Sequence, residues 1–215
     1  MIRVLIVDDH QLVREGVKQI LRADPGVEVA AEAASGDAAL ALVSKESFDV
    51  VVLDMSMPGL SGIQLIKRLK IERPNLRILI VSMHGENQYA ARALKAGASG
   101  YLTTDSASSL LRAAIHKIAA GGVHISEDAA AGLLAAPAAD HATPHRTLSD
   151  REFEILLLLA EGHGPTEIGE ALHLSVKTVS THKTRILQKM NLSGTAELVR
   201  YALEHRLLER RPGEG

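Results

Sequence analysis

The sequence predicts an α/β domain, in which helices cover both faces of a parallel sheet (doubly wound), followed by a small all-α domain. Residues 1–121 alternate short apolar runs with stretches of helical periodicity, which is typical of that architecture. Residues 122–147 are rich in Ala, contain two prolines and are predicted to be a linker. Residues 148–211 show helical periodicity only and predict the second domain.

Five apolar runs in the first domain predict strands. The third of them is an uninterrupted aliphatic run, which is typical of a strand buried on both faces. The predicted strands are Val4–Val7, Val27–Ala33, Val50–Leu53, Ile78–Val81 and Gly100–Leu102. Helices are predicted between and after them, around residues 12–21, 36–44, 62–71, 87–96 and 107–120.

Helix-start signals divide the second domain into four helices. Ser149 and Glu152 have the spacing of a capping box, and Pro165 suits the first turn of a second, short helix. A three-residue turn then leads to Ser175, which can cap a third helix that runs to about Met190. A fourth helix starts near Thr195. Two helices joined by so short a turn predict a helix-turn-helix.

Three aspartates follow two of the predicted strands. Asp8 and Asp9 come after the first strand, and Asp54 comes after the third, just before Pro58 and Gly59. An aspartate at a strand end is often only a helix cap or a turn residue. Three carboxylates at one edge of a sheet would however repel each other unless a hard cation lay between them. We therefore expect a magnesium site at this edge.

The third helix of the second domain carries a polar, basic face. Positions 177, 180, 181, 184 and 188 share one face and are all polar. Residues 176–190 contain no acid, whereas a solvated helix face usually mixes both signs. An acid-free face on the second helix of a helix-turn-helix favours contact with double-stranded DNA. The cations in this segment are Lys177, Lys183, Arg185 and Lys189.

Composition narrows the class of protein. The 215-residue chain has no cysteine, which excludes disulfides and thiolate metal sites, and its net charge is −2. It has no apolar run of membrane-spanning length and no visible signal peptide, so we expect a soluble cytoplasmic protein without a membrane partner.

Motifs in both domains resemble those of two-domain response regulators of the NarL/FixJ type, which join a flavodoxin-like receiver to a LuxR-type DNA-binding domain. The motifs are V-D-D-H (7–10), L-D-M-S-M-P-G (53–59), K-A-G-A-S-G-Y-L (95–102), L-S-D-R-E (148–152) and S-V-K-T-V-S-T-H (175–182). The resemblance covers nearly the whole chain except the Ala-rich linker and the last residues.

This resemblance implies a phosphorylation site in the receiver. Asp54 would accept a phosphoryl group from a sensor histidine kinase. Ser82 would then move to bond the phosphoryl group, and Tyr101 would follow it inward. The protein would not otherwise be an enzyme, although the receiver would catalyse its own phosphorylation and dephosphorylation. The implied magnesium ligands are Asp8, Asp9, Asp54 and the backbone carbonyl of Ser56.

The resemblance also implies how the second domain would bind DNA. The protein would bind paired half-sites as a homodimer when phosphorylated and would regulate transcription, with RNA polymerase as a further partner. Lys177 and Lys183 can reach phosphates, and the positions of Ser180, Thr181 and Thr184 read bases in the family. The full set of expected DNA-contact residues is Lys177, Ser180, Thr181, Lys183, Thr184, Arg185 and Lys189.

Two departures from the family pattern stand out. Thr104 occupies the position of the family lysine in Y-L-x-K, so no cation is supplied there. An alternative is therefore a DNA-binding regulator that is insensitive to phosphorylation. In the second domain the family's G-x-S-N-K-E-I-A is replaced by G-H-G-P-T-E-I-G (162–169). Its Gly169 would cost about 1 kcal/mol relative to alanine in a helix.

An aspartyl-nucleophile phosphatase is an alternative of a different class. Such enzymes also combine a strand-end aspartate with magnesium, and they typically carry a second aspartate two residues after the nucleophile. This chain has Ser56 at that position, which disfavours the phosphatase.

Overall fold

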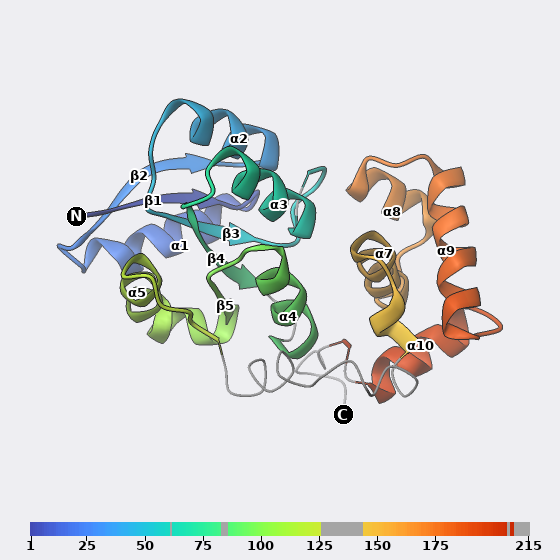
Figure 1. Ribbon diagram of the computed structural model, residues 1–215. Helices are drawn as coiled ribbons and strands as arrows, with labels where there is room; N and C mark the ends of the chain where they lie inside the picture. The colour runs from blue at the N-terminus through green and yellow to red at the C-terminus, as the bar shows by residue number, and fades with distance from the viewer. Residues whose placement is uncertain (61, 83–85, 126–143, 206, 209–215) are drawn as a thin grey trace. The chain divides into compact units, whose positions relative to one another are not determined.

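The computed structural model describes residues 1–60, 62–82, 86–125, 144–205 and 207–208 (Figure 1). The chain divides into two compact units, Met1–Leu133 and Leu134–Gly215. Most of the predicted linker, residues 126–143, lies outside the described residues, as do the last residues of the predicted second domain. None of the helices that the structure describes combines the length and apolarity that a membrane crossing requires.

The first unit contains a five-stranded, all-parallel sheet in the order β2-β1-β3-β4-β5. All five predicted strands are confirmed, and their ends differ from the predicted ends by at most two residues. The strands are β1 (Ile2–Val7), β2 (Val27–Ala33), β3 (Val50–Asp54), β4 (Arg77–Ser82) and β5 (Gly100–Thr103).

Helices cover both faces of this sheet, which confirms the doubly wound architecture (Figure 1). Alternate residues of β3 face opposite sides, with Val51 and Leu53 in one apolar cluster and Val50 and Val52 in the other. The first cluster includes residues of α2, α3 and α4, and the second includes residues of α1 and α5. These helices are α1 (Gln11–Arg22), α2 (Gly36–Lys45), α3 (Gly62–Glu72), α4 (Glu86–Ala96) and α5 (Thr104–Ala119).

The first unit continues beyond its predicted end at residue 121. The backbone N–H of Tyr101 donates to the carbonyl of His124 at 2.8 Å, and the N–H of His124 donates to the carbonyl of Ser99 at 3.1 Å. Residues next to His124 therefore lie against β5 and are not linker. The sequence hides this because a single bridge has no periodicity.

The described residues of the second unit form helices joined by turns, with no strand among them. It contains η2 (Pro144–Thr147, a 3-10 helix), α7 (Asp150–Ala160), α8 (Pro165–Leu172), α9 (Val176–Met190) and α10 (Thr195–Glu204). The predicted capping box of α7 is confirmed, because Ser149 N–H donates to Glu152 Oε2 at 2.8 Å and Glu152 N–H donates to Ser149 Oγ at 3.3 Å.

The second unit begins before residue 148, where the sequence predicts its start. His145 of η2 is buried, and its Nδ1 lies 2.6 Å from the hydroxyl of Tyr201 on α10. The His145 ring also lies 6.3 Å from the Phe153 ring and 5.7 Å from the His205 ring, measured between centroids. This aromatic cluster anchors the end of the predicted linker to the helical unit.

Gly169 of α8 has a role in the helix-turn-helix that its low helix propensity does not reveal. A Cβ atom at this position would lie 2.7 Å from the carbonyl oxygen of Leu174. The backbone N–H of Leu174 also donates to the Gly169 carbonyl at 2.8 Å. The glycine therefore lets the turn approach α8 closely, and the sequence-based expectation of a simple cost was incomplete.

We expect Gly36→Ala to lower the free energy of unfolding by about 1–3 kcal/mol, because the added Cβ overpacks a close backbone contact. That Cβ would lie 1.9 Å from the carbonyl oxygen of Leu60. Chemical denaturation measures the change. Gly16→Ala is the matched control, because among the described residues no atom outside its own stretch of helix lies within 4 Å of the added Cβ, and alanine favours the helix by about 0.5–1 kcal/mol. Equal stabilities for the two variants would contradict the predicted contact.

Candidate functional site

The three predicted aspartates meet at the carboxyl edge of the sheet. Strands β1 and β3 are neighbours, and Val7 pairs with Leu53, so the residues that follow emerge side by side. Ligand atoms of Asp8, Asp9, His10 and Asp54 all lie within 4.8 Å of one another. His10 was not among the ligands predicted from the sequence, although its position directly after the two aspartates is a signal.

Burial and like charge weaken the acidity of the central carboxyls. Burial, together with the charge of Asp8, raises the pKa of Asp54 to about 6 against the opposing hydrogen bond from the Ser56 backbone. Burial also raises the pKa of Asp8, although the His10 N–H donates to its Oδ1 at 2.7 Å. The folded chain therefore pays a free-energy cost to ionise this site.

The donor set fits a hard divalent cation. The site offers carboxylate oxygens, and Asp9 Oδ1 is buried without a hydrogen-bond partner among the described residues, although His10 Nδ1 lies 3.1 Å away. Oxygen donors are the ligands that Mg²⁺ prefers. Ser56 lies two residues beyond Asp54 in the adjoining loop, on the same edge.

The three predicted switch residues lie in the neighbouring strands and helix. Ser82 ends β4 and is fully buried, one residue beyond the register partner of Asp54. Tyr101 of β5 is also buried, with only 1% of its surface exposed. Thr104 begins α5 directly after β5 and is exposed. A threonine there brings a neutral hydroxyl to a position where the family has a lysine.

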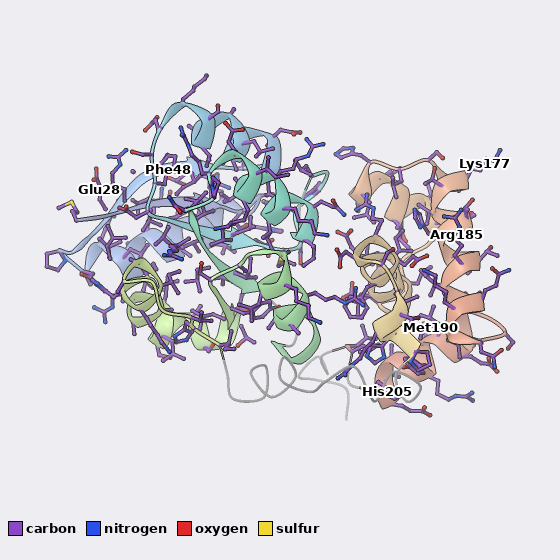
Figure 2. All side chains as sticks on the ribbon, in the orientation of Figure 1. Glu28, Phe48, Lys177, Arg185, Met190 and His205 are labelled. Carbon is purple, nitrogen blue, oxygen red and sulfur yellow. The ribbon has the colours of Figure 1, made fainter. Side chains whose placement is uncertain are left out.

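The second predicted site is the outer face of α9. Figure 2 shows Lys177 and Arg185 on this helix, and both side chains are exposed, whereas Lys183 is half-buried. The opposite face of α9 is buried in the helical unit through Val179, Ile186 and Met190. The structure therefore leaves a polar, basic face of α9 uncovered within this unit.

Three hydroxyls on this face donate to the helix itself. Ser180 Oγ donates to the Val176 carbonyl at 2.9 Å, and Thr184 Oγ1 donates to the Ser180 carbonyl at 3.0 Å. Thr181 Oγ1 donates to the Lys177 carbonyl at 2.9 Å. Because each hydroxyl proton is used in this way, these side chains offer acceptor lone pairs and, for threonine, a methyl group.

Lys189 has an internal partner that the sequence analysis did not foresee. Its Nζ lies 2.6 Å from Oε2 of Glu152, a buried side chain of α7. Burial alone would raise the pKa of Glu152, but the hydrogen bonds from Lys189 and Ser149 hold it below its usual value. Among the four cations predicted to contact DNA, Lys189 is thus drawn into an ion pair that joins α9 to α7.

We expect Asp54→Asn to raise the free energy of unfolding at pH 7 by about 1–3 kcal/mol without divalent cations. The folded-state pKa of about 6 lies above the ordinary aspartate value of 3.8, so the ionisation penalty is full above about pH 6 and absent below about pH 4. The variant should therefore lose its advantage as the pH falls to 4. Urea denaturation across this range measures it, and a pH-independent difference would contradict the assigned cause.

We expect Lys189→Ala to lower the free energy of unfolding by about 1–3 kcal/mol, because the buried Glu152 carboxylate would lose a partner. Lys183→Ala on the same helix is the matched control and should change stability little. Lys183→Ala should instead weaken binding to all DNA similarly and reduce the salt slope by about one unit. Thermal denaturation and DNA titration at two salt concentrations separate the two effects.

Two family descriptions match the two units. Residues 4–116 match the response regulator receiver domain, and residues 146–202 match the bacterial regulatory proteins of the luxR family. The response regulator UvrY of Escherichia coli K12 is 36% identical over 209 residues, which cover 96% of each chain. The oxygen regulatory protein NreC of Staphylococcus carnosus is 37% identical, over 96% of this chain and 99% of NreC.

Solved structures of the RcsB response regulator share the architecture. One from Salmonella typhimurium has a TM-score of 0.75 and 29% identity, over 96% of this chain and 98% of that chain. RcsB from Salmonella enterica serovar Typhimurium, bound to promoter rprA in the presence of the phosphomimetic BeF3-, has a TM-score of 0.68 and 27% identity, over 93% and 97%. Together with the two family matches, these similarities show that the chain belongs to the response regulators of the NarL/FixJ type, with a receiver domain followed by a LuxR-type helix-turn-helix domain.

Proposed function

We propose that this protein accepts a phosphoryl group on Asp54 from a sensor histidine kinase and, as a homodimer, binds DNA to regulate transcription. The observation that carries the proposal is the group of Asp8, Asp9 and Asp54, whose ligand atoms meet at one edge of the sheet. The uncovered basic face of α9 supports the DNA-binding half of the proposal.

The chemistry begins with an ionised Asp54. An oxygen of its carboxylate attacks the phosphorus of a phosphohistidine, the phosphorus–nitrogen bond breaks, and the imidazole leaves with that electron pair. A pKa of about 6 leaves most of the Asp54 carboxyls ionised at pH 7. Asp8, Asp9, Asp54 and the backbone carbonyl of Ser56 would hold Mg²⁺, which neutralises charge on the phosphoryl oxygens when bound.

The switch would work without the family lysine. Ser82 is buried one residue past the register partner of Asp54, which supports this role: its hydroxyl would bond the phosphoryl group after a small movement. Tyr101 is already buried, so its inward position imposes no further burial cost. Thr104 can offer one neutral hydrogen bond at most. This weaker charge compensation favours, as a second candidate, a regulator whose DNA binding is insensitive to phosphorylation.

The proposed DNA-contact residues fall into two groups, cations and short polar side chains. Lys177, Lys183 and Arg185 would contact phosphates, which position the protein without reading sequence. Ser180, Thr181 and Thr184 would lie against base edges as acceptors and methyl groups, so that discrimination is modest at each base. Lys189 contributes less, because Glu152 holds it. RNA polymerase is a further proposed partner, and the cytoplasm is the proposed location.

One experiment tests both halves. Acetyl phosphate and Mg²⁺ should add one phosphoryl group to the chain, and Asp54→Asn should abolish the addition; intact-mass spectrometry measures it. DNA affinity is then titrated with and without acetyl phosphate on fragments selected from a random library. A phosphorylation-dependent rise in affinity and in dimer fraction supports the switch.

The outcomes separate the candidates. Labelling of Asp54→Asn at the wild-type level would refute the phosphoryl acceptor. Labelling of Asp54 without any change in DNA affinity would favour the phosphorylation-insensitive regulator.

A further inference from the structure

We propose that Arg14 is a positioning residue for the acidic site, and that the affinity of this site for Mg²⁺ depends on it. Arg14 lies on α1, outside the group of Asp8, Asp9, His10 and Asp54. The proposal rests on the proposed function, because it concerns the same magnesium site.

The main chain of Asp8 is held from both sides. Its N–H donates to the carbonyl of Ala33, the last residue of β2, at 3.1 Å. Its carbonyl accepts a hydrogen bond of 2.7 Å from Nη1 of Arg14. The carboxylate of Asp8 in turn accepts the N–H of His10 at 2.7 Å. The peptide groups on either side of the Asp8 Cα are thus fixed, and Arg14 holds the second of them.

Arg14 is itself held in place. Its Nε donates to Oε2 of Glu32 at 3.2 Å, and its side chain is only 16% exposed. The other carboxylate oxygen of Glu32 accepts Lys18 Nζ at 2.7 Å. The Lys18 hydrogen bond lowers the pKa of Glu32 against the opposing effect of burial, and the Arg14 hydrogen bond lowers it further. The planar guanidinium can therefore donate to the Asp8 carbonyl and to Glu32 at once, which an ammonium on a flexible chain does less well.

The close approach of the carboxylates explains why the Asp8 backbone would need a positioning contact. Ligand atoms of Asp8, Asp9 and Asp54 lie within 4.8 Å of one another, so like charges on these carboxylates repel. The loop after β1 would relieve that repulsion by moving outward. A hydrogen bond from Arg14 to the Asp8 carbonyl opposes this movement without neutralising either carboxylate. Arg14 would thus preorganise the metal site through the backbone.

Isothermal titration of Mg²⁺ into the full chain tests the proposal. We expect Arg14→Ala to weaken Mg²⁺ binding by about 10-fold, as the loss of an outer-shell partner does elsewhere. Arg14→Lys should fall between the wild type and Arg14→Ala, because a lysine can reach one of the two acceptors but not both. Thermal denaturation of each variant establishes that it is folded, and Arg14→Lys keeps the test available should Arg14→Ala unfold.

Arg73→Ala is the matched control. Arg73 also donates to main-chain carbonyls of the receiver, those of Val43 at 3.1 Å and Ser44 at 3.2 Å, but away from the acidic edge. This variant should lose stability and keep wild-type Mg²⁺ affinity. Glu32→Gln should weaken Mg²⁺ binding less than Arg14→Ala does and add nothing to it in the double variant, because Glu32 acts through Arg14.

The outcomes distinguish this proposal from the proposed function. If the wild type binds Mg²⁺ and Asp8→Asn abolishes binding, but Arg14→Ala binds like the wild type, the role of Arg14 is refuted and the metal site stands. If Arg73→Ala loses as much Mg²⁺ affinity as Arg14→Ala, the effect is general destabilisation and the positioning role is refuted. If the wild type binds no Mg²⁺ at all, both proposals fail.

Discussion

Like-charge repulsion at the carboxyl edge of the sheet is the constraint on which the rest of the receiver depends. The buried aliphatic strands β1 and β3 pair in parallel, and this pairing brings Asp8 and Asp54 to one edge despite the repulsion between their charges. The apolar core therefore stabilises an arrangement that its own acidic residues oppose. A raised pKa at Asp54 is the electrostatic sign of that conflict.

The surrounding residues limit the cost of this repulsion without removing it. Backbone N–H groups of His10 and Ser56 donate to the carboxylates, and Arg14 holds the Asp8 carbonyl. A site in which charge is compensated incompletely favours binding of a cation or loss of a carboxylate charge. That is the physical reason why the metal-dependent phosphoryl acceptor that we propose suits this edge.

In the helical domain, α9 is held in place by packing and an ion pair while its basic face stays uncovered. The buried Glu152 caps α7 and pairs with Lys189 of α9, and the cluster around His145 and Tyr201 ties η2 to α10. One cation of α9 is therefore used for internal stability, and Lys177 and Arg185 remain exposed. The Lys189–Glu152 ion pair thus both fixes the position of α9 and removes one cation from its free surface charge.

The sequence by itself determined the strand and helix pattern, the parallel sheet with aspartates at its carboxyl edge, and the capping box at Ser149. It could do so because periodicity and local hydrogen bonding are properties of neighbouring residues. Only the tertiary structure decided that Lys189 pairs with Glu152, that Arg14 reaches the Asp8 carbonyl, and that His124 and His145 belong to folded units and not to a linker. It also explained Gly169 by a close contact with Leu174. These contacts join residues far apart along the chain or depend on backbone proximity in a turn, and no sequence period encodes either of them.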